Sequence, residues 1–149
     1  MPAKKKRQLS LLGRSEARFP SKPDGRILET FVNRNRQRDY WITLECPEFT
    51  SLCPVTGQPD FASLQIRYIA DELCVETKSL KFYLASFRST PSFGEDVVNR
   101  ILNDLVAALR PRRLRVEARF APRGGISLCV HAEHPDLSFC VYETRAGLR

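Results

Sequence analysis

The fold is decided by the segment Leu114-Arg-Val-Glu-Ala-Arg-Phe-Ala-Pro-Arg-Gly-Gly-Ile-Ser-Leu-Cys-Val130. Apolar and polar residues alternate strictly from Leu114 to Phe120, which is the pattern of a half-buried strand. Pro122 to Gly125 supply turn residues, and the alternation resumes at Ile126. The segment therefore predicts two antiparallel strands joined by a hairpin.

Two helices are predicted before this hairpin. Helical spacing follows the short apolar run Leu73–Val75, and a second helix is predicted from about Glu95 to Leu109, where Pro111 ends it. Apolar residues recur with a 3.6-residue period in both segments. They are Leu80, Tyr83, Leu84 and Phe87 in the first, and Val98, Ile101, Leu102, Leu105, Val106 and Leu109 in the second.

Two further strands are predicted at residues 39–46 and 64–69, separated by a long turn-rich loop from Pro47 to Asp60. A weak last strand is predicted over Phe139–Tyr142. The order strand, strand, helix, helix, strand, strand predicts an α+β fold, an antiparallel sheet with helices on one face. Because both sheet edges would be open, we expect an oligomer.

The length of 149 residues fits one domain, which we assign to residues 26–149 after a basic, polar arm at 1–25. No apolar run approaches the roughly 20 residues of a membrane span. The basic start of the chain leads into no apolar stretch, so we expect neither a secretory signal nor a membrane association.

The net charge of +7 favours an anionic partner. This excess of positive charge fits a nucleic-acid partner or a phosphorylated cofactor. It also fits a surface whose charge serves only solubility. Five cysteines form no C-x-x-C pair, and free thiols fit the reducing cytoplasm. Cys74 and Cys129 lie in strand patterns, where we expect small core residues.

Cys53 lies among Pro, Thr and Gly in the predicted loop, where a ligand could reach its thiol. Asp60 follows across turn-forming prolines and could fold back beside it. A thiolate with a nearby acid is the minimum for covalent catalysis with proton delivery. An ordinary surface cysteine with a turn-capping aspartate fits the spacing equally well.

The run Glu76-Thr-Lys-Ser-Leu-Lys-Phe-Tyr83 opens the first predicted helix. Lys78 and Lys81 are three residues apart and share one helix face. Beside free helix N–H groups they would suit a phosphate or a dinucleotide, although a solvated helix start has the same pattern. No G-x-G-x-x-G follows a strand, so we do not expect a Rossmann domain.

A metal site is not expected. Cys129, His131 and His134 have a C-x-H-x-x-H spacing that matches no standard zinc pattern and lacks a fourth ligand.

Several of these motifs together resemble the NADPH-dependent 7-cyano-7-deazaguanine reductases, the nitrile reductases of queuosine biosynthesis. The run Glu76–Tyr83 is similar to the family signature, and Cys53–Asp60 is similar to its nucleophile loop. Further matches are Ser86–Arg88, Phe93–Asp96, Asn103–Leu105 and Pro122–Ile126. The similarity runs from about Phe31 to Leu128, and the length resembles the short, single-domain branch.

The resemblance implies the tunnelling fold, in which subunits join their sheets into barrels. For the short branch it implies a double ring of ten subunits with active sites at subunit interfaces. The partners would then be the small-molecule substrate and other copies of the chain, and direct nucleic-acid binding is not expected.

The resemblance also implies a reaction, the reduction of the nitrile of 7-cyano-7-deazaguanine to the aminomethyl group of 7-aminomethyl-7-deazaguanine with two NADPH. Cys53 would form a covalent thioimide with the nitrile carbon, and Asp60 would protonate the nitrogen. Substrate-binding positions would be Val75, Glu76, Thr77, Gly94 and Glu95. Cofactor-binding positions would be Lys78, Ser79, Lys81 and Arg123.

One position departs from the family pattern. The family usually has histidine before the acid at Glu95, and this chain has Gly94. A water molecule, His131 or His134 are the candidates to fill that space. Two alternatives to the reductase remain at this point: an enzyme that adds ammonia to the same nitrile without reduction, and a basic RNA-binding module without catalysis.

Overall fold

The computed structural model describes residues 19–136. The strands are β1 (Thr30–Val32), β2 (Trp41–Leu52), β3 (Pro59–Ile69), β4 (Leu73–Val75), β5 (Arg113–Arg123) and β6 (Ile126–His134). The helices are α1 (Thr77–Ala85) and α2 (Gly94–Leu109), with short 3-10 turns η1 (Gly25–Ile27) and η2 (Ser86–Ser89). The predicted strand at 139–142 lies outside the described residues.

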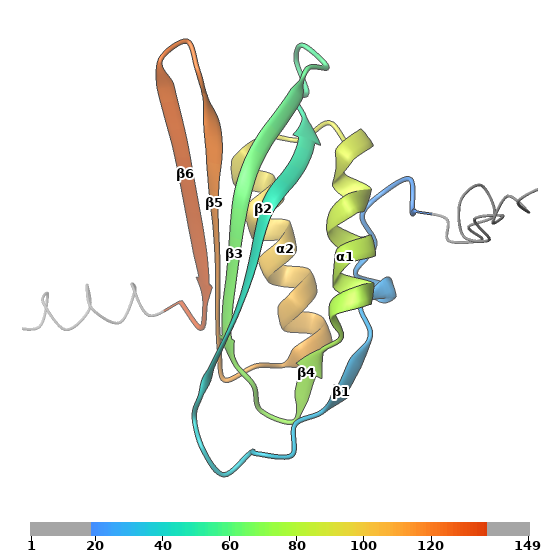
Figure 1. The fold of residues 1–149 in the computed structure, drawn as a ribbon, viewed down its shortest axis with the longest axis vertical. Helices are drawn as coiled ribbons and strands as arrows, with labels where there is room; N and C mark the ends of the chain where they lie inside the picture. Colours follow the sequence, from blue (N-terminus) through green and yellow to red (C-terminus); the bar gives the residue numbers. More distant parts are fainter. Residues whose placement is uncertain (1–18, 137–149) are drawn as a thin grey trace, which may run out of the picture.

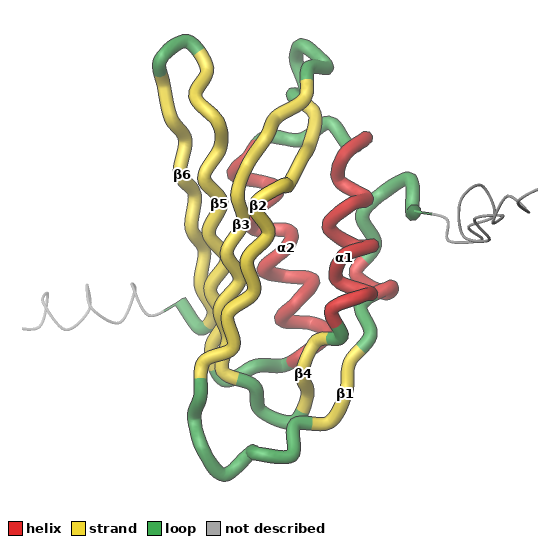
Figure 2. The backbone as a smooth tube through the Cα atoms, in the orientation of Figure 1, coloured by secondary structure: helices red, strands yellow, loops and turns green. Residues whose placement is uncertain are grey.

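The main sheet has four antiparallel strands in the order β2-β3-β5-β6. Both helices cover one of its faces, as Figures 1 and 2 show. The predicted α+β class and the order strand, strand, helix, helix, strand, strand are confirmed for this sheet. The two hairpins, β2–β3 and β5–β6, lie side by side because β3 pairs with β5.

The predicted loop from Pro47 to Asp60 is wrong in extent. Strand β2 continues through Pro47 to Leu52, and only the turn between Leu52 and Pro59 leaves the ladder. The register shifts between Cys46 and Phe49, a bulge that accommodates the missing N–H of Pro47. Proline is tolerated here because β2 is an edge strand of the main sheet.

Strand β1 was not expected from the sequence. Its three residues are all exposed, so no burial alternation marks it. It pairs antiparallel with β4 in a separate two-stranded sheet, with Thr30 opposite Val75 and Val32 opposite Leu73. The short run Leu73–Val75 is therefore a strand as predicted, but it belongs to this small sheet.

The core lies between the main sheet and the helices. In α2 the buried residues are Val97, Val98, Ile101, Leu102, Leu105 and Leu109. This matches the predicted apolar face with two differences: Val106 is only partly buried, and Val97, which was not predicted, is fully buried. Cys74 is buried as expected, but Cys129 is exposed. The expectation for Cys129 is wrong because its neighbours Leu128 and Val130 take the helix-facing positions of β6.

Residues 19–28 lie against the two helices. Phe19 packs on Phe82 of α1 with ring centroids 5.0 Å apart, and Arg100 of α2 donates to the Pro23 carbonyl at 2.6 Å. The part of the predicted arm before Phe19 lies outside the described residues. Among residues 19–136, no helix is both long and apolar enough to cross a bilayer.

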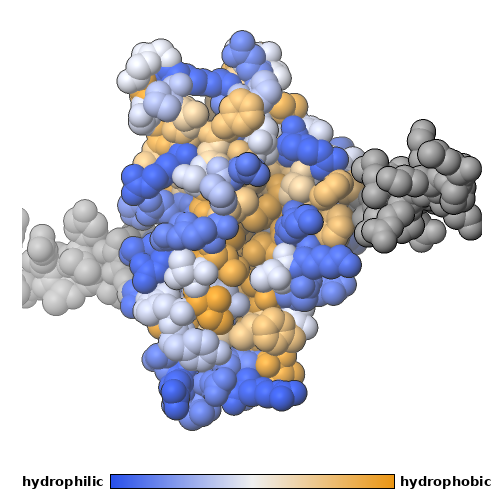
Figure 3. All heavy atoms as spheres, in the orientation of Figure 1, coloured by the Kyte–Doolittle hydropathy of each residue, from blue (hydrophilic) through white to orange (hydrophobic). Residues whose placement is uncertain are grey.

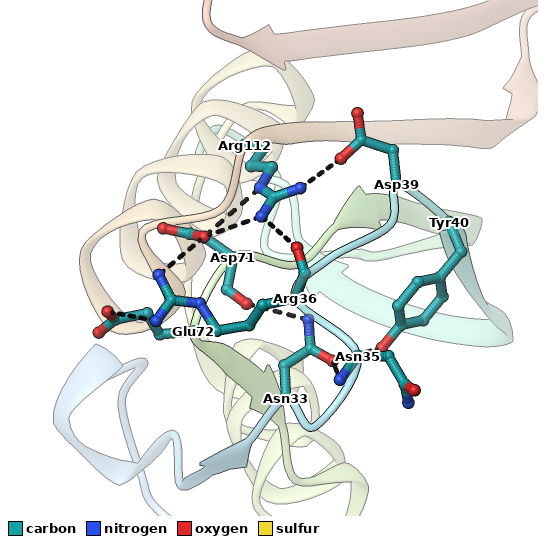
Figure 4. Close-up of polar contacts among 8 residues, drawn as sticks. All are labelled: Asn33, Asn35, Arg36, Asp39, Tyr40, Asp71, Glu72 and Arg112. Atoms are coloured by element: carbon teal, nitrogen blue, oxygen red, sulfur yellow. Dashed lines mark hydrogen bonds and ion pairs between the residues drawn. The ribbon is translucent and has the colours of Figure 1, made fainter.

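A polar cluster ties the connection between β1 and β2 to the start of β4 (Figure 4). Asn33 is buried; its amide donates to the Asp71 carbonyl at 2.9 Å, and its Oδ1 accepts from Tyr40 at 2.7 Å. Arg112, from the segment between α2 and β5, bridges Asp39 and Asp71. These contacts fix the position of the small β1–β4 sheet and therefore of the chain entering α1.

We predict that Tyr83→Phe lowers the free energy of unfolding by about 1–2 kcal/mol, since a hydrogen bond to a charged group is lost. The Tyr83 ring is fully buried, and its hydroxyl donates to Asp104 at 2.6 Å. Urea unfolding measures the change. Asp104→Asn is the matched partner: the double variant should cost less than the sum of the single ones, and strict additivity would contradict the prediction.

Candidate active site

Cys53 opens the tight turn between β2 and β3. Its N–H donates to the Gln58 carbonyl at 2.8 Å, and its own carbonyl accepts from the Gly57 N–H at 2.9 Å. Gly57 has a φ of 68°, a left-handed conformation that favours glycine. The turn thus holds a half-buried cysteine at the end of a regular hairpin, which a mobile loop would not do.

The surroundings of Cys53 favour its thiolate. Hydrogen bonds from the Thr56 side chain, the backbones of Thr56 and Val55, and the Arg123 guanidinium together lower the pKa of the Cys53 thiol to about 7. A thiolate is the reactive form in nucleophilic attack. A substantial fraction of Cys53 is therefore ready to react near neutral pH.

Asp60 and Arg123 meet between the tips of the two hairpins. Asp60 lies opposite Ser51 in the β2–β3 ladder, two residues before Cys53. Arg123 comes from the tip of β5–β6, and its Nη2 lies 2.7 Å from Asp60 Oδ1 and donates to the Pro59 carbonyl at 3.0 Å. The predicted neighbourhood of Cys53 and Asp60 thus contains a cation from a distant part of the chain.

The start of α2 lies beside the same turn. Leu52 donates to the Thr90 carbonyl at 3.3 Å, and the Ser92 N–H donates to the Leu52 carbonyl at 3.0 Å. This parallel pairing brings the segment that leads into α2 to the residue before Cys53, and Gly94 and the exposed Glu95 follow it at the start of the helix. Glu95 lies in the first turn of α2, where its carboxylate favours the helix dipole, and it has no ion-pair partner among the described residues.

Gly94 leaves no room for a side chain in this structure. A Cβ at this position would lie 2.8 Å from Cε2 of Phe120 and 3.0 Å from Cδ2 of Leu128. The space next to the glycine is therefore occupied by the β5–β6 hairpin. Neither candidate histidine is there: His131 pairs with Glu117 on the exposed face, and His134 pairs with Leu114 at the far end of β6.

The junction of β4 and α1 holds the other predicted substrate positions. Val75 is buried, and its N–H donates to the Tyr68 hydroxyl at 3.2 Å. Glu76 is the N-cap of α1; its carboxylate accepts from the N–H groups of Lys78 and Ser79, both at 2.7 Å. These bonds lower the pKa of Glu76. Thr77 follows at an exposed position.

The three predicted cofactor residues of α1 differ in exposure. Lys78 and Lys81 are exposed and have no ion-pair partner in the described part of the chain. Ser79 is buried; its hydroxyl donates to the Glu76 carbonyl at 2.8 Å and accepts from the Glu29 N–H at 2.9 Å. The expectation of free helix N–H groups is wrong for Lys78 and Ser79, because Glu76 occupies them.

The predicted residues form two groups at opposite ends of the subunit. The hairpin tips and the start of α2, which carry Cys53, Asp60, Arg123 and Glu95, lie at one end, whereas β4 and the start of α1, which carry Val75 and Glu76, lie at the other (Figure 1). Helix α1, nine residues and about 13 Å long, separates the two ends. One subunit therefore does not bring Glu76 to Cys53.

A groove of about 660 Å³ runs between β2 and α1. Thr77 and Lys81 line it together with Phe49 and Thr50 of β2. In the space-filling view an apolar band runs along the middle of this face (Figure 3). The β2 edge beside it makes no pairing with another strand of the described residues.

Sequence reasoning missed Thr56 and Tyr68. A hydroxyl three residues after a loop cysteine was a usable signal for Thr56, because a closed turn brings such residues together. Tyr68 gave no signal, since its place in an alternating strand predicts only core packing. Within residues 19–136, no three His, Cys, Asp or Glu side chains are arranged to hold a metal ion.

The crystal structure of an archaeosine synthase QueF-Like in the apo form has a similar fold. Its TM-score is 0.59 at 22% sequence identity, over 62% of this chain and 91% of that one. At this identity the likeness concerns the fold alone.

Sequence comparison identifies closer relatives, each named NADPH-dependent 7-cyano-7-deazaguanine reductase. The Streptococcus thermophilus protein is 53% identical over 82% of this chain and 75% of its own length. The Bacteroides thetaiotaomicron protein is 50% identical over 89% and 87%, and the Nitrosospira multiformis protein is 58% identical over 78% and 83%. The family model of the QueF-like proteins matches residues 59–138, from Pro59 at the start of β3 through the β5–β6 hairpin. With its cysteine turn, paired aspartate and two-hairpin sheet, the chain belongs to the QueF-like family.

Proposed function

We propose that this chain is an NADPH-dependent reductase that converts the nitrile of 7-cyano-7-deazaguanine to a primary amine in queuosine biosynthesis. The observation that carries the proposal is the cluster of Cys53, Asp60 and Arg123, with a thiol pKa of about 7. The names of the relatives support the substrate and the cofactor. The free thiols of the described cysteines support a cytoplasmic location.

The first chemical step uses only protein groups. The Cys53 thiolate adds to the electrophilic nitrile carbon, and the displaced π electron pair moves to the nitrogen. Asp60 can take the proton that leaves the thiol and return it to this nitrogen, which gives a neutral thioimide. Asp60 is the candidate for both base and acid because it pairs with Ser51, two residues before Cys53, and shares Arg123 with the Cys53 thiol.

Two NADPH molecules, bound in turn, would supply one hydride each, which gives the two hydrides that reduction of the nitrile to the amine requires. The residues that fit the NADPH phosphates are cationic and available: Lys78 and Lys81 on α1, and the remaining donors of Arg123. The Ser79 hydroxyl already bonds to the Glu76 carbonyl and the Glu29 N–H, so Ser79 would support the cofactor site by holding the start of α1 in place. After the first reduction the Cys53 thiolate leaves, and enclosure of the resulting imine excludes water that would hydrolyse it.

We further propose that two subunits complete each active site. Cys53, Asp60 and Glu95 would come from one subunit, and Val75, Glu76 and Thr77 from its neighbour, with the Glu76 and Glu95 carboxylates accepting from the purine-like edge. The opposite positions of these groups within one subunit support this. Gly94 would contribute its backbone alone.

The open edges support assembly. Strands β2 and β6 are the edges of the main sheet within the described residues. Pairing between such edges would join sheets into a barrel, as in the tunnelling fold, and we propose a double ring of ten subunits. Exposed Val55, Phe93 and Ile126 near the Cys53 end, and Phe31 and Val32 on β1, are suited to contacts between subunits.

The proposal is tested by mixing the protein with 7-cyano-7-deazaguanine and NADPH and following the reduced-nicotinamide absorbance. Two NADPH oxidised per nitrile support the reductase. A stable substrate adduct without oxidation would instead support the amidine-forming alternative, and neither reaction would contradict both.

Cys53→Ala is expected to abolish NADPH oxidation and leave the fold intact, because it removes the nucleophile from a turn held by backbone hydrogen bonds. Steady-state kinetics and circular dichroism measure the two effects. Cys129→Ala is the matched control, since this exposed thiol lies on β6 away from the turn, and it should keep normal activity. Full activity in Cys53→Ala would show that the mechanism is wrong.

The rate of covalent addition is expected to rise with pH through about 7 and to level off above it. The sign follows from the lowered pKa of Cys53, because the thiolate fraction grows as pH passes that value. Thr56→Val removes the largest cause of the shift and should move the midpoint to higher pH. Thr43→Val, at an exposed position of β2, should not. An unchanged midpoint in Thr56→Val would contradict this account.

Mixed oligomers test the shared site. Cys53→Ala and Glu76→Gln should each be inactive alone, but subunits unfolded together and refolded in equal amounts should regain about one quarter of wild-type activity, since that share of sites combines both intact halves. Gln keeps an oxygen to cap α1. A mixture as inactive as its parents would show that both halves belong to one subunit.

A further inference from the structure

Arg123 lies at the tip of β5–β6, and its side chain contacts the β2–β3 hairpin near its tip. It comes from strand β5, more than sixty positions along the chain from Asp60: the contact with Pro59 spans a sequence separation of 64. The guanidinium touches the Asp60 carboxylate, the Pro59 carbonyl and the surroundings of the Cys53 thiol. All of these contacts are made between groups of the protein itself.

We propose that Arg123 is a positioning residue that holds the Asp60 carboxylate beside Cys53 before the cofactor binds. This inference rests on the proposed function, and it adds to Arg123 a role that is separate from holding a phosphate. Arg123 acts through Asp60 and Cys53 and does not itself exchange a proton.

The geometry of the ion pair restricts Asp60. Asp60 has a side-chain exposure of 21%, and Oδ1 lies 2.7 Å from Arg123 Nη2. The same Nη2 donates to the carbonyl of Pro59, the residue just before Asp60. One nitrogen therefore bonds both to the side chain of Asp60 and to the backbone that precedes it, which fixes the carboxylate relative to its own strand.

A bulge and a two-glycine turn set the geometry of the hairpin that carries Arg123. The β5–β6 register shifts between Phe120 and Arg123, a bulge that can re-aim a side chain at the end of a ladder. Gly124 and Gly125 follow with φ values of 55° and 78°, which close the turn in left-handed conformations. The turn geometry thus places Arg123 beside the β2–β3 tip.

The charge of Arg123 also affects the nucleophile. It acts with Thr56 and Val55 to lower the pKa of Cys53, and it is the smallest of these causes. It offsets the negative charge that Asp60 would otherwise place near a developing thiolate. Arg123 therefore lets a thiolate and a carboxylate lie close together, as the addition step requires.

The two roles of Arg123 are compatible. A guanidinium has five N–H donors, and both the ion pair with Asp60 and the bond to Pro59 use Nη2. Other donors remain for a phosphate oxygen. An experiment can separate the two roles. If Arg123 only bound a phosphate of NADPH, replacing it would not change the reactivity of Cys53 in the absence of NADPH.

The test measures Cys53 in the absence of NADPH. Wild type, Arg123→Gln and Arg123→Lys are alkylated with iodoacetamide across a pH series, and peptide mass mapping follows Cys53 alone. Covalent addition of 7-cyano-7-deazaguanine is then measured at neutral pH, again without cofactor. Arg119→Gln is the matched control, because Arg119 lies on the same strand but pairs with Glu117 at 2.7 Å.

We expect Arg123→Gln to raise the alkylation midpoint of Cys53 by about half a pH unit and to slow nitrile addition about tenfold, since one charge and the anchor of Asp60 are lost. Arg123→Lys keeps the charge, so its alkylation midpoint should stay near that of wild type even if addition is slowed. Arg119→Gln should behave as wild type in both measurements.

A variant that changes only the KM for NADPH, with normal alkylation and normal addition, would overturn the proposal. Equal shifts in Arg123→Gln and Arg119→Gln would also overturn it, because the effect would then be one of general surface charge. If Arg123→Gln does not fold, a slow addition rate in a folded Arg123→Lys supports the proposal and an unchanged rate overturns it. Failure of the proposed function is distinguishable: wild type would then add no nitrile, whereas the alkylation series needs no substrate.

Discussion

The pairing of β3 on both of its sides is the constraint on which the rest of the structure depends. Ser51 lies opposite Asp60 on one side, and Ala62 lies opposite Phe120 on the other. These two registers bring both hairpin tips to the same end of the sheet. A one-residue shift in either strand pairing would turn the side chain of Asp60 or Arg123 to the opposite face of the sheet. The contact between these two residues beside Cys53 would then be lost. The chemistry of Cys53 is therefore a consequence of strand register.

The second half of the proposed site depends on a different set of contacts. The β1–β4 sheet, the buried Asn33 and the hydroxyls of Tyr68 and Ser79 fix the chain as it enters α1. In this arrangement the Glu76 carboxylate would make two kinds of contact. It caps α1 through two backbone N–H groups, and a carboxylate has further lone pairs for the edge of a purine-like ligand. Cap and ligand contact would reinforce each other, since both favour the ionised form.

Much of the fold could be predicted from local patterns. The alternation from Leu114 to Phe120 and the helical period after Glu95 reflect burial on one face, and the structure has β5 and α2 there. Pro47 misled the prediction because an edge strand with a bulge tolerates a residue that a central strand does not. Strand β1 has no burial pattern, so only its partner β4 reveals it.

The candidate site could be predicted less fully. Cys53 and Asp60 are close in sequence, so a turn suffices to place them in one hairpin tip, where they share Arg123. The buried state of Ser79 depends on Glu29, fifty positions away, and no local pattern encodes that contact. The separation of Glu76 from Cys53 follows from the path of α1, which periodicity alone does not reveal.

The central claim is that Cys53 is the nucleophile, made reactive by its turn. The most direct measurement is the mass of the full-length protein after incubation with 7-cyano-7-deazaguanine alone, followed by peptide mapping. The account predicts a mass increase of one substrate molecule, located on Cys53, with the other cysteines unmodified. An unchanged mass, or an adduct on another cysteine, would contradict it.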